Sequence, residues 1–265
     1  MMIRTTLIAA LLIATAGCDQ RAAFERLVPK DDAAFAMGTF DALRTRNFGI
    51  VEGRLDRSLV TAATRLQLEQ MSSALGSDTP QDVRVIGAST NTVNGVVTYV
   101  GLTLEYRLSQ RWLLASMNLH RMGNDRTIDA INVQPTIDSQ ERLNRFTFSG
   151  KGPANYIMLA STTSVFVFIV GTLVILWRTH IPRRRWLWVL FVAIGIGQFT
   201  LNWTTGRIAM QPLQVSLLGA GFTKPGPYAP WFLSVAVPVG AVIFLVRRRR
   251  WLADAPQPTS GSKAI

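Results

Sequence analysis

Residues 97–108 have the sequence VTYVGLTLEYRL, and this stretch decides the fold of the first half of the chain. Its even-numbered positions are mostly apolar, whereas its odd-numbered positions include Tyr99, Glu105 and Arg107. A strand places successive side chains on opposite faces of its sheet. The alternation therefore predicts a strand with one buried face and one partly polar face.

Turn signals on both sides divide the neighbouring sequence into further strands. Residues 94–95 are Asn-Gly, a pair typical of a β-hairpin, and residues 123–125 are Gly-Asn-Asp. The second turn separates a strand over 111–121 from one over 126–133. With a first strand beginning at Val83, these segments predict an antiparallel meander.

Two helices are predicted ahead of the meander. Asp31 and Asp32 can cap a helix that runs to about Arg46, and apolar residues recur at helical spacing over 59–75. Helices followed by a meander are typical of an α+β domain, which we place at residues 18–150.

The order of these elements resembles the nuclear-transport-factor and ketosteroid-isomerase superfamily, whose curved sheet forms a cone around its helices. Residues 33–56, AAFAMGTFDALRTRNFGIVEGRLD, are similar to the first helix and following turn of small exported bacterial members. The resemblance covers residues 24–135, and a cystatin-like or other α+β sheet fits the same pattern. It implies a pocket at the open end of the cone, which in some members is catalytic and in many binds ligands or proteins.

Few residues in this domain are candidates for a site. Tyr99, Glu105 and Asp129 could face a pocket, and His120 is the only histidine ahead of the apolar segments. A proton-abstracting isomerase needs a carboxylate base and an acid pair for the oxyanion, and this set cannot be mapped onto the chain. We therefore predict Tyr99, Glu105 and His120 as ligand-binding residues and no catalytic residue. The simpler alternative places Glu105 on a solvated sheet face and His120 on the outer face of a strand.

The residues that other kinds of functional site require are absent from the sequence. A single cysteine excludes a disulfide and a thiolate metal site within the chain, and there is no Walker loop, dinucleotide glycine pattern or G-x-S-x-G motif. We expect no metal and no cofactor. Residues 18–150 contain 15 Lys and Arg and 15 Asp and Glu, so the formal charge of +12 belongs to the rest of the chain. That distribution argues against a nucleic-acid partner.

Three uncharged apolar segments follow residue 150, at 156–177, 186–203 and 230–246. A helix that crosses a bilayer needs ~20 apolar residues. The sequence therefore predicts three transmembrane α-helices in a membrane domain over 151–252. The tail, 253–265, is predicted to be a disordered cytoplasmic segment.

Arginine clusters at 183–185 and 247–250 indicate how the spans are oriented. Cytoplasmic loops carry an excess of Lys and Arg, so both clusters are predicted to be cytoplasmic and the α+β domain periplasmic. The connection over 204–229 is predicted to be either a re-entrant or interfacial helix or an ordinary periplasmic loop.

The first residues resemble a bacterial lipoprotein signal. Residues 1–17 have a positive start and a short apolar stretch that ends in small residues, and Cys18 follows. In enteric lipoproteins an aspartate such as Asp19 resembles the signal for retention in the inner membrane. The alternative is an N-terminal transmembrane helix with an incidental cysteine.

These observations predict a lipid-anchored protein of the bacterial inner membrane. Its periplasmic domain is expected to bind a partner protein or small ligand, as an accessory or sensory subunit. Because Cys18 already supplies a lipid anchor, further membrane segments indicate a protein partner within the bilayer. The alternative function is a small-molecule isomerase or dehydratase that uses a cone-shaped pocket. The oligomeric state is left open.

Replacing Cys18 tests the lipoprotein interpretation. We expect mass spectrometry of the wild-type N-terminus to show a lipid-modified Cys18, and Cys18→Ser to accumulate an uncleaved precursor that stays in the membrane. An N-terminus that still begins at Met1 in the wild type would contradict the interpretation.

Overall fold

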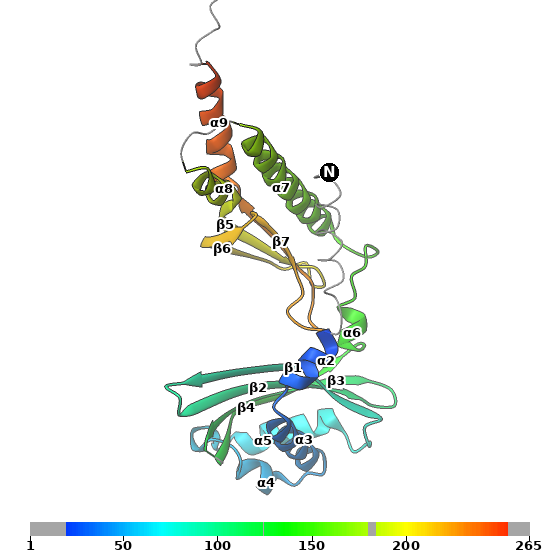
Figure 1. Cartoon of the computed structure of the whole chain (residues 1–265). Helices are drawn as coiled ribbons and strands as arrows, with labels where there is room; N and C mark the ends of the chain where they lie inside the picture. Colours follow the sequence, from blue (N-terminus) through cyan, green and yellow to red (C-terminus); the bar gives the residue numbers. More distant parts are fainter. Residues whose placement is uncertain (1–19, 124, 180–183, 254–265) are drawn as a thin grey trace, which may run out of the picture. The chain divides into compact units, whose positions relative to one another are not determined.

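The computed structural model describes residues 20–123, 125–179 and 184–253, which fall into two units (Figure 1). The first unit comprises the residues up to Arg145 together with Pro225–Ala229, and the second comprises Phe146–Lys224 and the residues from Pro230 onward. The predicted signal peptide, Cys18, Asp19 and the tail beyond Ala253 lie outside the described residues.

The first unit consists of helices followed by a four-stranded antiparallel sheet with strand order β1-β2-β3-β4. Figure 1 shows α3, α4 and α5 on one face of this sheet. The elements are α2 (Gln20–Leu27), α3 (Lys30–Arg44), α4 (Phe48–Glu52), the 3-10 helix η2 (Arg57–Leu59), α5 (Thr64–Leu75), β1 (Asp82–Val93), β2 (Val97–Arg107), β3 (Trp112–Met122), β4 (Asp125–Thr136) and α6 (Gln140–Leu143).

Alternation along β2 and β3 builds the core of this unit. The even-numbered residues of β2 and the odd-numbered residues of β3 point to the same face, because the strands pair in register with Leu104 opposite Ala115. That face packs on α3 and α5, and burying a side chain the size of Leu stabilises the fold by about 1.5–3 kcal/mol. The buried residues include Phe40, Leu43, Leu68, Leu75, Val100, Leu102, Leu104, Tyr106, Leu113, Ala115, Met117 and Leu119.

β4 contains an irregularity that bears on function. Its register with β3 shifts after Asn118, which pairs with Ala130, while Leu119 pairs with Ile128, so Asp129 is an extra residue in β4. At the same point Ile128 forms an isolated parallel bridge with Leu55. The bulge and the bridge together fix the segment that precedes η2 against β4.

A buried ion pair joins the first turn of α3 to the hairpin of β3 and β4. Asp32 is fully buried, and its carboxylate accepts hydrogen bonds from Arg126 Nε at 2.7 Å and from Arg121 at 3.3 Å. Its place in the first helical turn also suits a negative charge.

The second unit combines helices with a second antiparallel sheet of order β6-β5-β8-β7. Two clusters of buried residues hold it together, one around Ile169, Leu176 and Phe244 and the other around Leu201, Trp203 and Leu233. The elements are α7 (Pro153–Arg178), α8 (Arg185–Ala193), β5 (Ile194–Asn202), β6 (Ile208–Leu217), β7 (Ala220–Thr223), β8 (Phe232–Val237) and α9 (Val239–Ala253).

The predicted fold class, with three transmembrane helices after the sheet, is wrong. Within the described ranges only α7 is long and apolar enough to cross a membrane. The predicted span 186–203 divides into α8 and β5, and the span 230–246 divides into β8 and α9. The connection 204–229, predicted as a helix or a loop, contributes β6 and β7.

Glycine and proline explain both divisions. Gly197 has φ +70°, which is outside the helical region, and a Cβ at Gly195 would lie 2.8 Å from the Cβ of Ala236 on β8. Pro238 separates β8 from α9 and has no N–H with which to extend a ladder. Short apolar runs of this kind suit a buried strand as well as a helix.

The role of Asp32 can be tested by its replacement. We expect Asp32→Ala to lower the free energy of unfolding of the first unit by about 2 kcal/mol, because two arginines lose charge-assisted hydrogen bonds. Hydrogen exchange of β3 and β4 peptides in the full-length protein measures this locally. Asp31→Ala is the matched control, since Asp31 is exposed in the same turn. Equal effects of the two replacements would contradict the assignment.

Candidate functional site

All three residues predicted to bind a ligand lie on the outer face of the first sheet. Tyr99 and Glu105 occupy odd positions of β2 and His120 occupies an even position of β3, opposite to the face that packs on the helices. Tyr99 and His120 are register partners, and their ring centroids are 6.2 Å apart. Glu105 is six residues along β2 from Tyr99, about 20 Å away in an extended strand.

A polar cluster surrounds His120. Its Nδ1 lies 2.6 Å from Oδ1 of Asp129, the extra residue of the β4 bulge. Asp56 completes the group, because one potential ligand atom from each of Asp56, His120 and Asp129 lies within 4.8 Å of the others. All three side chains are half-buried.

The backbone places these side chains. The N–H of Asp56 donates to the carbonyl of Ile128 at 2.9 Å, and the N–H of Ile128 donates to the carbonyl of Arg54 at 2.8 Å. Asp56 also caps η2, where its Oδ1 accepts hydrogen bonds from the N–H and the hydroxyl of Ser58. These bonds lower the pKa of the Asp56 carboxyl, and the nearby His120 contributes in the same direction.

A pocket of about 230 Å³ opens beside the cluster, between α5 and β4. Asp129 is one of the residues that line it. The other lining residues are Leu55, Leu59, Thr64, Gln67, Leu68, Met71, Ala130 and Ile131.

Sequence reasoning identified part of this cluster. It named Tyr99, His120 and Asp129 but did not join His120 to Asp129, and it did not find Asp56. No sequence signal connects a loop residue at position 56 with a strand residue at position 129. The connection depends on the bulge and on the bridge between Leu55 and Ile128.

Glu105 has a different environment. Its side chain is fully buried rather than solvated, Oε1 accepts a hydrogen bond from the N–H of Gln140 at 2.5 Å, and Arg84 Nε lies 3.6 Å from Oε2. Burial raises the pKa of the Glu105 carboxyl, against the opposing effects of the Gln140 N–H and of Arg84. The carboxylate joins β2 to α6, so its role in the described structure is to hold the fold.

A segment from late in the chain covers the same end of the sheet. Tyr228, in Pro225–Ala229, is 6% exposed, and its carbonyl accepts a hydrogen bond from Asn144 Nδ2 at 2.8 Å. Its ring contacts Phe24 edge to face, and the Arg21 guanidinium lies 5.4 Å from the ring centroid. Arg21 in turn pairs with Glu141 of α6 at 2.9 Å. The segment is therefore an integral part of the first unit.

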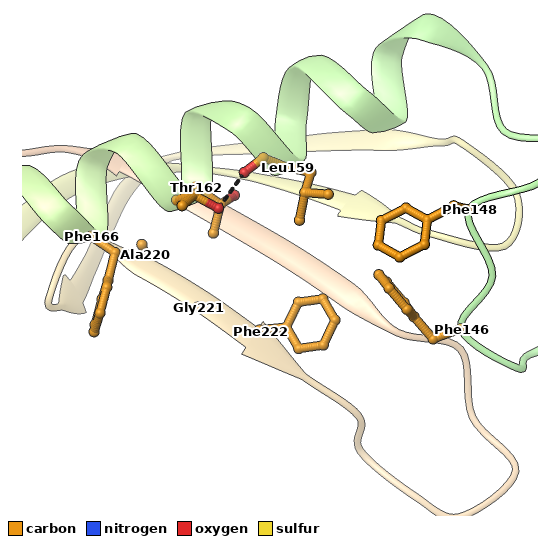
Figure 2. A pocket seen from close by; sticks show the side chains of 9 residues that line it. Phe146, Phe148, Leu159, Thr162, Phe166, Ala220, Gly221 and Phe222 are labelled. Carbon is orange, nitrogen blue, oxygen red and sulfur yellow. Dashed lines mark hydrogen bonds between the residues drawn. The ribbon is translucent and has the colours of Figure 1, made fainter. Parts of the chain in front are cut away.

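The second unit has an apolar pocket of about 420 Å³ beside α7 (Figure 2). Figure 2 shows Phe146, Phe148 and Phe222 gathered at one end of it. Phe146 also stacks on Trp203, with centroids 4.7 Å apart. Among the residues that line the pocket, Thr162 and Thr163 are the ones with polar side-chain atoms. Its remaining lining residues are Leu159, Phe166, Ala220 and Gly221.

No protein family, no curated protein and no solved structure matches this chain. The resemblances to a lipoprotein signal and to the nuclear-transport-factor and ketosteroid-isomerase superfamily therefore remain predictions.

The raised pKa of Glu105 has a consequence for stability. An acid whose pKa is higher in the folded state contributes less stability as the pH rises above the ordinary value of 4.5. We expect Glu105→Gln to remove this dependence, so that its stability relative to the wild type improves as the pH rises above the ordinary value of 4.5. Urea titrations followed by pulse proteolysis of the full-length protein measure the difference. A difference that is constant across this range would contradict a raised pKa.

Proposed function

We propose that this chain is an exported, membrane-embedded binding protein that acts as an accessory or sensory subunit of an inner-membrane partner. In this proposal the first unit lies on the periplasmic side and binds, and the second unit supplies the membrane attachment. The predicted acylation of Cys18 and the retention signal at Asp19 belong to the same proposal.

The surface of the second unit supports a membrane environment. α7 has 26 residues, which makes it about 39 Å long, and it exposes large apolar side chains such as Phe166, Val167 and Trp177. Arg178, Arg184 and Arg185 follow its apolar stretch. Since positive charge gathers on the cytoplasmic side, the end of α7 at Arg178 is the cytoplasmic end in this proposal.

The single observation that carries the proposal is the position of Pro225–Ala229. The chain passes between the two units after Arg145, before Pro225 and after Ala229. A passive tether needs only one such connection. A segment that joins β7 and β8 of the second unit, yet belongs to the first unit and buries Tyr228 there, provides in this proposal a route for a change in one unit to act on the other.

Packing of the first sheet supports binding over the isomerase or dehydratase alternative. The sheet face that would line a cone-shaped pocket is packed on α3 and α5, with Leu102, Leu104 and Met117 buried. Glu105, the buried carboxylate of the outer face, is bonded to the backbone of α6. The open polar cluster at His120 lies at the other end of β2 and β3.

Crosslinking in intact membranes, followed by affinity isolation of the full-length protein, tests this function. We expect the wild type to recover a specific inner-membrane protein. Tyr228→Ala should lower that recovery, because it removes an aromatic pair worth about 1 kcal/mol, equivalent to about fivefold in an equilibrium. Tyr228→Phe is the matched control, since it keeps the aromatic ring that contacts Phe24.

Two results would contradict the proposal. Absence of any specific membrane partner from the wild-type sample would remove the binding function. Unchanged recovery by Tyr228→Ala, at equal abundance, would show that Pro225–Ala229 is structural only.

A further inference from the structure

The cluster at the β4 bulge has the composition of a metal site. It contains one imidazole, from His120, and two carboxylates, from Asp56 and Asp129. Imidazole nitrogen is a common ligand of zinc and of other first-row transition metals. Carboxylate oxygen also binds these ions and is the ligand that manganese favours. Three protein ligands leave further coordination positions for water or for a bound molecule.

The charge balance of the cluster also favours a cation. Among the described residues, neither Asp56 nor Asp129 forms an ion pair with a lysine or arginine. Arg121 and Arg126 are directed to Asp32, and Arg57, which contributes to lowering the pKa of the Asp56 carboxyl, forms no ion pair with it. With a neutral imidazole the cluster carries two negative charges, and a single histidine can balance only one of them.

The ligand positions are fixed before any ion binds. Asp56 is held by its backbone bond to Ile128 and by its cap on η2, and Asp129 is placed by the bulge. His120 lies within the ladder of β3. Ligands on ordered elements reduce the conformational entropy lost on binding. The three side chains are half-buried, so solvent reaches them in part.

We propose that Asp56, His120 and Asp129 bind a divalent transition-metal ion, either zinc or manganese. This inference rests on the proposed binding function and names the class of ligand that the first unit recognises. Binding replaces the contact between His120 Nδ1 and Asp129 Oδ1 by two bonds to the ion.

Calorimetry of the full-length protein, purified in detergent and stripped of metal with a chelator, tests the site. Zn²⁺ and Mn²⁺ are the probes, and Mg²⁺ is the comparison, because it has less preference for imidazole. We expect one ion per chain. His120→Ala and Asp129→Asn should each weaken binding by at least about a hundredfold. That figure is the largest loss of affinity usual for replacing a residue that only supports a metal ligand, and loss of a ligand itself should cost no less.

Asp56→Asn separates coordination from folding. Asparagine can still accept the hydrogen bonds of Ser58 and cap η2, so the fold is retained while the charged ligand is lost. Asp125→Asn is the matched control, because Asp125 is an exposed carboxylate on the same strand as Asp129. It should leave the affinity unchanged.

The metal site is wrong if the wild type binds neither Zn²⁺ nor Mn²⁺, or if the three ligand variants bind as tightly as Asp125→Asn. If zinc binds to all variants with equal affinity, other residues coordinate it and the proposed site is wrong. Recovery of the membrane partner, measured on the same variants, distinguishes the two proposals. A partner still recovered by a wild type that binds no metal would overturn the metal site and leave the binding function standing.

Discussion

The first unit depends on one constraint, which is that the sheet face formed by β2 and β3 is filled by α3 and α5. Leu102, Leu104 and Met117 fill the middle of that face. Because successive side chains of a strand point to opposite faces, every polar residue between them is directed to the outer face or to the sheet edge. The core thus determines where a site can form, although it contributes no residue to one.

The two ends of the outer face then differ in what covers them. At the Glu105 end the carboxylate is buried and accepts a hydrogen bond from the N–H of Gln140 in α6, so it serves the fold. At the His120 end the side chains are half-buried, and a pocket adjoins Asp129. By residue type alone, the carboxylates of Glu105 and Asp129 would be equally good candidates for a site. The His120 end is the candidate for ligand binding, because its side chains are partly exposed to solvent and Asp129 lies beside a histidine, whereas Glu105 is bonded to the backbone of α6.

Alternation along 97–108 was sufficient to predict β2 and its buried face, and the turn signals at 94–95 and 123–125 predicted the meander around it. The cluster at His120 could be predicted only in part, because the position of Asp129 depends on a bulge and that of Asp56 on a bridge between distant segments. The apolar runs after residue 185 were misassigned for a different reason. Their length favoured helices, whereas Gly195, Gly197 and Pro238 carried the evidence for strands and breaks.

Pro225–Ala229 also bears on how the first unit can be inherited or exchanged. A domain encoded by one uninterrupted stretch of sequence can be transferred between genes as a unit. The first unit differs, because it includes Pro225–Ala229, which follows Arg145 by about eighty residues. Ending the chain at Arg145 would uncover Phe24 and deprive Asn144 of its bond to the Tyr228 carbonyl. The two units are therefore constrained to evolve as a single gene segment.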